Sequence, residues 1–127
     1  MAHKILVIDD DKINVTLVKF ALAEQDYAVV FANDGDEGLK LVKSENPDLI
    51  ILDIQMPRMN GYEFMGELKR LQGVKTTPVI MLTANETMEQ LFQVEGVKAY
   101  FLKPVNLTGL IKRIKEILGP NPMGERV

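Results

Sequence analysis

The chain has 127 residues and a formal net charge of −3, with 46% of its residues hydrophobic and 26% charged. This composition is typical of a globular protein. The length is close to the commonest domain size, which predicts one domain with a single core. There is no cysteine, which excludes disulfides and Cys-based metal sites, and the spread of the lysines argues against direct nucleic-acid binding. No apolar run is long enough to span a membrane, and the opening MAHKILVIDDD shows no secretory leader, so we expect a cytoplasmic location.

The first apolar segment, Lys4–Ile8, predicts a strand that ends at three consecutive acids, Asp9, Asp10 and Asp11. The following segment, Lys12–Glu24, predicts the first crossover helix. Its apolar residues recur at helical spacing: Ile13, Leu17, Phe20 and Ala21. An apolar strand therefore places carboxylates at its carboxyl end, directly before a helix.

The second and third strands are predicted at Ala28–Ala32 and 49–52, with a helix between them that Asp34 caps and Pro47 follows. The third strand does not alternate with polar residues, so both of its faces must be covered, as in the centre of a parallel sheet. It ends in Asp53. Taken alone, Asp53 is as readily explained by capping a turn as by serving a site.

The second half of the chain continues the alternation of strands and helices. We expect a helix beginning at Asn60 with Phe64, Leu68 and Leu71 on one face, a strand at 79–82, a weaker helix at 86–95 and a strand at 99–102. A last helix carries the clearest apolar stripe, formed by Leu107, Leu110, Ile111, Ile114, Ile117 and Leu118. Thr83 ends the fourth strand and Lys103 follows the fifth. The domain is expected over 1–119, followed by a flexible tail or linker stub over 120–127.

Five strands that alternate with helices predict an α/β fold with a parallel sheet and helices on both faces. For five such units the expected arrangement is the flavodoxin-like three-layer fold with strand order 2-1-3-4-5. In that order the first and third strands flank the point where the strand order reverses, and ligands bind beyond the carboxyl ends of the strands there. These are the two strands that end in aspartates.

Three acids, Asp9, Asp10 and Asp53, would therefore meet in one crevice. Like charges about 5 Å apart repel by roughly 3 kcal/mol per pair at an effective dielectric near 20, so the cluster either holds protons or binds a cation. Carboxylate oxygens without Cys or His favour Mg²⁺ or a similar ion, although acids also suit the start of a helix without any ion. With the hydroxyl of Thr83 and the ammonium of Lys103 at the same edge, the set contains what is needed to stabilise a transferring phosphoryl group.

The ordered motifs ILVIDDD, LDIQMPRMNG, VIMLTA and AYFLKP, each at its own strand end, resemble the receiver domain of two-component response regulators over nearly the whole chain. The resemblance implies that Asp53 accepts a phosphoryl group from a phosphohistidine of a histidine kinase. It also implies that Asp10, Asp53 and the backbone carbonyl of Gln55 ligate Mg²⁺, with Mn²⁺ as an alternative ion. Asp9 would help to hold the ion through a water molecule.

The same resemblance gives roles to residues of the last two strands. Lys103 would pair with phosphorylated Asp53, Thr83 would move toward the phosphoryl group, and Tyr100 would turn inward as the coupled aromatic switch. Pro104 would hold a cis peptide bond. Gln55 and Asn85 stand at positions that tune phosphoryl lifetime in this family, and neither carries a charge, so no rate is predicted.

The chain is thus expected to be a phosphorylation-controlled binding module rather than a metabolic enzyme, with only self-catalysed phosphoryl transfer and dephosphorylation. Its expected partners are a sensor histidine kinase or phosphotransfer protein and a downstream target or output domain. The output partner would bind the face made by the fourth helix, the fifth strand and the fifth helix, and the protein would be a monomer or a phosphorylation-dependent dimer. The helix at 86–95 has under three turns, so we expect it to be mobile and to be better ordered when Asp53 is phosphorylated or when a partner is bound.

Two other readings use similar parts. A phosphatase of the haloacid dehalogenase type also uses an aspartate after a strand together with Mg²⁺, but it requires a second aspartate two residues later, where Gln55 stands. A flavodoxin would bind a flavin phosphate after the first strand, where Asp9, Asp10 and Asp11 would repel it.

Overall fold

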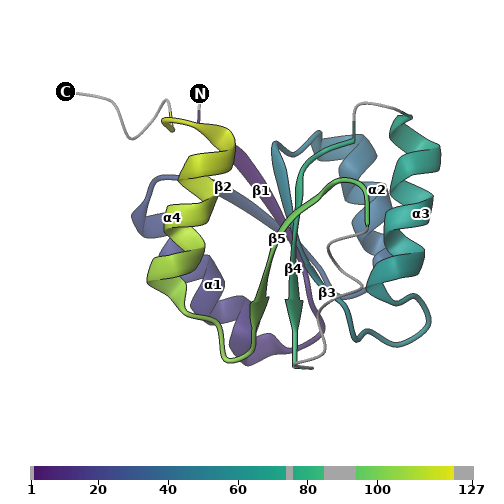
Figure 1. The fold of residues 1–127 in the computed structure, drawn as a ribbon, viewed down its shortest axis with the longest axis horizontal. Helices are drawn as coiled ribbons and strands as arrows, with labels where there is room; N and C mark the ends of the chain where they lie inside the picture. Colours follow the sequence, from purple (N-terminus) through teal and green to yellow (C-terminus); the bar gives the residue numbers. More distant parts are fainter. Residues whose placement is uncertain (1, 74–75, 85–93, 122–127) are drawn as a thin grey trace.

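A computed structural model describes residues 2–73, 76–84 and 94–121 of the chain. It contains one parallel sheet in the order β2-β1-β3-β4-β5, with α1 and α4 on one face and α2 and α3 on the other (Figure 1). The strands are β1 (Lys4–Ile8), β2 (Ala28–Ala32), β3 (Leu49–Asp53), β4 (Val79–Thr83) and β5 (Val97–Leu102). The helices are α1 (Lys12–Glu24), α2 (Gly35–Glu45), α3 (Gly61–Gln72) and α4 (Leu107–Leu118). The predicted flavodoxin-like fold and its strand order are confirmed.

The core lies on both faces of the sheet, because side chains of each strand alternate between them. On one face, Leu6 and Ile8 of β1 pack with Phe64 of α3; on the other, Ile5 and Val7 pack with residues of α1 and α4. Every residue of β3 and β4 is buried, whereas the edge strands β2 and β5 are partly exposed. The uninterrupted apolar run at 49–52 therefore has the explanation expected from the sequence, a central strand covered on both faces.

N-cap side chains fix the points at which α1, α2 and α3 begin. Asp11 caps α1 and accepts hydrogen bonds from the amides of Ile13 and Asn14, while Asp34 caps α2 and accepts from the amide of Glu37. At α3 the cap is reciprocal. The side chain of Asn60 accepts a hydrogen bond from the amide of Glu63, and the side chain of Glu63 accepts one from the amide of Asn60. The caps predicted at the starts of α2 and α3 are confirmed.

One expected helix face proves to be exposed. In α1 the residues that face the sheet are Asn14, Val18 and Leu22, each buried. The apolar residues that indicated the helix lie beside this face, and Ile13, Leu17 and Phe20 are 75%, 52% and 64% exposed. The helix was placed correctly, but the apolar stripe read from the sequence lies mostly outside the core. In α3, Leu71 is likewise 38% exposed, and the buried residues are Gly61, Phe64, Met65 and Leu68.

A helix was expected at 86–95, and residues 86–93 of it lie outside the described part of the chain. Val94 and Glu95, which that expectation placed in the last turn of the helix, instead precede β5 in a bend and a turn. None of the helices in 2–73, 76–84 and 94–121 is long and apolar enough to cross a membrane.

Candidate functional site

The polar residues predicted to converge lie at the carboxyl edge of the sheet, where the arrowheads of β4 and β5 point in Figure 1. Asp53 and Thr83 are the last residues of β3 and β4, while Asp9 and Lys103 directly follow β1 and β5. Asp9, Asp53 and Thr83 are 1%, 3% and 1% exposed. Because all five strands are parallel, their carboxyl ends meet at one edge, and four strands contribute one polar side chain each.

Lys103 joins the two buried acids. Its Nζ lies 3.1 Å from Oδ2 of Asp9 and 3.3 Å from Oδ2 of Asp53. The sequence led us to expect a pair with Asp53 after phosphorylation, and the structure shows that the lysine already contacts both carboxylates without it. One ammonium thus offsets part of the negative charge of two buried carboxylates, and the attraction favours the ionised form of Asp53.

Asp9 is held by further donors. Its Oδ1 accepts a hydrogen bond from the amide of Asp11 at 2.9 Å, and its Oδ2 accepts one from Nδ2 of Asn14 at 2.7 Å. Asn14 was not predicted as a site residue. The only signal in the sequence was its position, four residues before Val18 and eight before Leu22, which places a polar amide on the buried face of α1.

A third acid completes a cluster that suits a divalent cation. One carboxylate oxygen from each of Asp9, Asp10 and Asp53 lies within 4.8 Å of the others, so a single ion can contact all three. Asp10 is exposed, unlike the other two, and gives the cluster access to solvent. The donor set consists of hard oxygens, which suits Mg²⁺, Ca²⁺ or Mn²⁺ rather than a thiophilic metal.

The pKa of Asp53 reflects this crowding. Burial, followed by the negative charge of Asp9, raises the pKa of Asp53 from 3.8 to about 6, although Lys103 and the amide of Gln55 act in the opposite direction. That amide donates to Oδ1 of Asp53 at 3.2 Å. Burial by itself lowers the pKa of Lys103, but its hydrogen bond to Asp9 and the charges of Asp53 and Asp9 outweigh burial and raise the pKa. At neutral pH the site therefore holds an ionised but poorly solvated Asp53 beside a protonated lysine.

Comparison with known proteins identifies the family. The family model described as the response regulator receiver domain matches residues 5–115 of the sequence. The match spans most of the chain and includes every residue of this site. The chain belongs to the receiver domain family. This membership excludes the haloacid dehalogenase and flavodoxin readings and confirms the resemblance seen in the sequence.

Relatives of this receiver domain include both a regulator of gene expression and single domains. The alkaline phosphatase synthesis transcriptional regulatory protein PhoP of Bacillus subtilis (strain 168) is 38% identical over 120 residues, which are 93% of this chain and 49% of that protein. The chain therefore spans about half the length of this curated relative. The structure of the chemotaxis protein CheY4 of Vibrio cholerae superposes with a TM-score of 0.85 at 31% identity, covering 93% of this chain and 100% of that one. The structure of a CheY-like receiver domain protein of Methanospirillum hungatei JF-1 superposes with a TM-score of 0.83 at 32% identity, covering 93% of this chain and 94% of that one.

The residues that were expected to switch this receiver domain lie on neighbouring strands. Thr83 is buried at the end of β4, where its backbone carbonyl accepts a hydrogen bond from the amide of Lys103 at 2.8 Å. Tyr100 is partly buried in β5, pairs in register with Met81 and packs against the core on the α2 and α3 face. Thr83 thus belongs to the site edge, while Tyr100 lies three residues before Lys103 on the adjacent strand.

The loop after Asp53 is tied to the start of α2. Arg58 has a positive φ of 69° and its Nη2 lies 3.1 Å from Oδ2 of Asp34. A side chain at Gly35 would meet the sulfur of Met59 at 2.6 Å, so the loop packs closely against this helix. The peptide bond between Lys103 and Pro104 is cis, as expected. Asn85 lies outside the described residues.

Proposed function

We propose that Asp53 is the phosphoacceptor of this receiver domain. An Oδ atom of ionised Asp53 attacks the phosphorus of a phosphohistidine, the P–N bond breaks, and its electron pair remains on the departing imidazole nitrogen. The product is an acyl phosphate on Asp53. The observation that carries the proposal is the contact of Lys103 Nζ with Oδ2 of Asp53, because it places a fixed positive charge where the phosphoryl oxygens would arrive.

We assign the acid cluster to Mg²⁺, with Mn²⁺ as the alternative ion. Asp10, Asp53 and the backbone carbonyl of Gln55 would hold it, and Asp9 would contribute through water. When bound, the ion neutralises negative charge on the phosphoryl group and on the carboxylates. The close approach of the three acids supports this assignment, since without a cation their mutual repulsion is only partly offset by Lys103.

Intact mass tests the acceptor directly. A small-molecule acyl phosphate with Mg²⁺ should add one phosphoryl group to the wild type and none to Asp53→Asn. Asp26→Asn is the matched control, because Asp26 is an exposed turn residue with positive φ, a conformation that asparagine also adopts. Equal labelling of wild type and Asp53→Asn would rule out Asp53, and the added group should be released by hydroxylamine, as acyl phosphates are.

Receiver domains interact with histidine kinases and downstream targets, and the exposed side of α1 supports a docking site for a protein phosphodonor on this helix. Ile13, Leu17 and Phe20 form an apolar strip that begins four residues after Asp9, so it starts beside the site. Three large apolar side chains that are more than half exposed on one helix are typical of an interaction surface. We place a helix of the phosphodonor protein on this strip.

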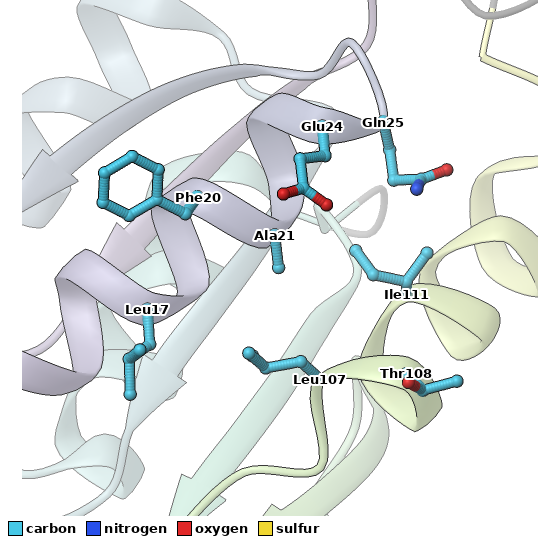
Figure 2. Close-up of a pocket in the computed structure, with 8 residues that line it drawn as sticks. All are labelled: Leu17, Phe20, Ala21, Glu24, Gln25, Leu107, Thr108 and Ile111. Carbon is cyan, nitrogen blue, oxygen red and sulfur yellow. The ribbon is translucent and has the colours of Figure 1, made fainter.

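A hollow of about 360 Å³ continues the strip toward α4. Figure 2 shows Leu17, Phe20 and Ala21 of α1 on one side of the hollow and Leu107 and Ile111 of α4 on the other. The walls are mainly aliphatic or aromatic, with Glu24 and Gln25 at the end farther from the site. Such a groove between two helices accepts the apolar face of a third helix.

The docking surface is tested by comparing two phosphodonors. Leu17→Ser should slow transfer from a phosphorylated histidine kinase that labels the wild type, while leaving labelling by a small-molecule acyl phosphate unchanged. Leu71→Ser is the control, because Leu71 is also exposed but lies on α3, across the sheet. If Leu17→Ser and Leu71→Ser affect transfer from the kinase equally, the α1 strip is not the docking surface.

The output surface is proposed over β5, the last helix and the segment at 86–95. Thr83 and Tyr100 support this placement, since both lie on the strands that border this segment. A downstream protein or an output domain would bind there when Asp53 is phosphorylated, and a phosphorylation-dependent dimer would use the same face. Residues 1–119 would form the receiver domain and 120–127 a tail or linker.

A further inference from the structure

Asn14 is a polar residue at a position that the fold would fill with an apolar one. It lies on the buried face of α1 with Val18 and Leu22, and it is 8% exposed. Asparagine is also a weaker helix former than leucine by several tenths of a kcal/mol, and burying its amide costs more unless the amide is hydrogen-bonded. Neither helix formation nor core packing therefore explains the choice of asparagine here.

The partner of the Asn14 amide does explain it. Nδ2 of Asn14 donates to Oδ2 of Asp9 at 2.7 Å, which is shorter than either contact of this carboxylate with Lys103 Nζ, at 3.1 and 3.3 Å. The amide of Asp11 donates to the other oxygen at 2.9 Å. Asp9 is thus held from three directions, by α1, by the turn after β1 and by the residue that follows β5.

Each of these donors has a different consequence for the site. Asp11 donates through its backbone amide and holds one oxygen of Asp9, Oδ1, against the turn after β1. Lys103 is shared with Asp53, so its contact with Asp9 must weaken whenever the lysine turns toward a phosphorylated Asp53. Asn14 donates through its side chain to Oδ2, the oxygen of Asp9 that lies nearest to Lys103, and it is not shared with Asp53 among the contacts of the described residues. Its amide therefore keeps this oxygen in place when Lys103 moves.

We propose that Asn14 is a positioning residue for the cation and phosphoryl site: its amide fixes the orientation of the Asp9 carboxylate so that Asp9 keeps facing Asp10 and Asp53. The inference rests on the proposed function, in that it concerns the same cluster of acids. It adds a residue from the buried face of a helix to a site otherwise built from the ends of strands. The expected size of the effect is that of other outer hydrogen bonds to metal-binding groups, a loss of about 10-fold in cation affinity.

The test is Mg²⁺ titration of unphosphorylated protein by calorimetry, which reports binding without any phosphoryl transfer. Asn14→Leu preserves size and burial but removes the donor, and it should weaken Mg²⁺ binding about 10-fold. Asn14→Ala does the same with a smaller side chain and serves if the leucine does not pack. Val18→Ala is the matched control, because Val18 lies on the same buried face one turn further from the site, and its dissociation constant for Mg²⁺ should equal that of the wild type.

A second readout separates positioning from general loosening of α1. In metal-free protein, the carboxyl ¹³C resonance of Asp9 should shift in Asn14→Leu and Asn14→Ala and stay in place in Val18→Ala. If both Asn14 variants bind Mg²⁺ as tightly as the wild type, or if Val18→Ala weakens binding as much as they do, the proposal is wrong. Failure of wild-type protein to become phosphorylated on Asp53 would overturn the proposed function and leave these two binding results standing on their own.

Discussion

The two edges of the sheet both bury polar side chains, but they do so in opposite ways. At the amino edge, Asn121 is 7% exposed, accepts from the amide of His3 at 3.1 Å and donates to the carbonyl of Gln25 at 2.8 Å. These bonds join the start of β1, the end of α1 and the segment after α4 without involving any charge. At the carboxyl edge, Asp9 and Asp53 share one lysine, and the pKa of Asp53 is raised by burial and by its neighbour.

This contrast separates polar groups that stabilise the fold from polar groups that serve the site. The buried amide of Asn121 is compatible with a stable core, because its oxygen and its nitrogen each have a hydrogen-bond partner. Three carboxylates with one ammonium carry uncompensated negative charge, so they are costly until a cation or a phosphoryl group changes the balance. Removing an acid from the carboxyl edge should therefore stabilise the fold in the absence of Mg²⁺, whereas removing Asn121 from the amino edge should destabilise it whether or not Mg²⁺ is present.

The largest effect is expected for Lys103→Met, which removes the ammonium that contacts both buried acids. The free energy of unfolding should fall by about 3 kcal/mol, since deleting one partner of a buried ion pair costs about 3 to 5 and Lys103 is not fully buried. Urea denaturation at neutral pH without Mg²⁺ measures it. Lys69→Met is the control: its pair with Glu95 is exposed, and the denaturation midpoint should not move. Equal midpoints for wild type and Lys103→Met would contradict the account of the acid pair.

Asn121→Ala should have the next largest effect, at the other edge. It leaves the amide of His3 and the carbonyl of Gln25 without their partner, and the expected loss is about 2 kcal/mol. The same denaturation experiment with and without Mg²⁺ checks both parts of the comparison, because this loss should be identical in the two conditions. A loss that Mg²⁺ reverses would show that the edges are not independent.

A smaller effect is expected from pH. The pKa of Asp53 is raised to about 6 in the folded protein against 3.8 for an ordinary aspartate, so between these values the folded state binds the proton more tightly than the unfolded state does. The contribution of Asp53 to stability therefore falls as pH rises from about 4 to above 6. Asp53→Asn lacks this titration, so without Mg²⁺ its stability relative to the wild type should increase across the same range. A difference between the two proteins that is constant from pH 4 to 7.5 would show that the pKa of Asp53 is not raised.

The strands and their chemistry were readable from the sequence because a parallel sheet imposes simple rules. Runs of branched apolar residues at 49–52 and 79–82 required central strands, and the expected strand order was that of the flavodoxin-like arrangement of five such units. Once the order is known, residues at the carboxyl ends of parallel strands must share an edge, so the sequence predicts that Asp9, Asp53 and Lys103 lie close together.

What the sequence missed depends on side-chain packing. Helix α1 carries two neighbouring stripes, and the one richer in large apolar residues, with Leu17 and Phe20, faces outward, whereas the stripe with Asn14 faces the core. Hydrophobicity alone selects the wrong stripe, because a docking surface and a core face have the same composition. The hydrogen bond between Asn14 and Asp9 could not be predicted for the same reason, since it forms only if the stripe that contains Asn14 is the buried one.

The most direct test of the account is the stability of wild type and Asp53→Asn at pH 7.5, each measured with and without Mg²⁺. Without the ion, Asp53→Asn should be more stable by about 1 kcal/mol, because repulsion with Asp9 and Asp10 is relieved while part of the attraction to Lys103 is lost. With Mg²⁺ at about 100 times its dissociation constant, the wild type should gain about 2.7 kcal/mol and become the more stable of the two. Two results would contradict the account: Asp53→Asn is the less stable protein without Mg²⁺, or it gains as much stability from the ion as the wild type does. Either result would show that Asp53 is not part of a cation site whose carboxylates repel one another.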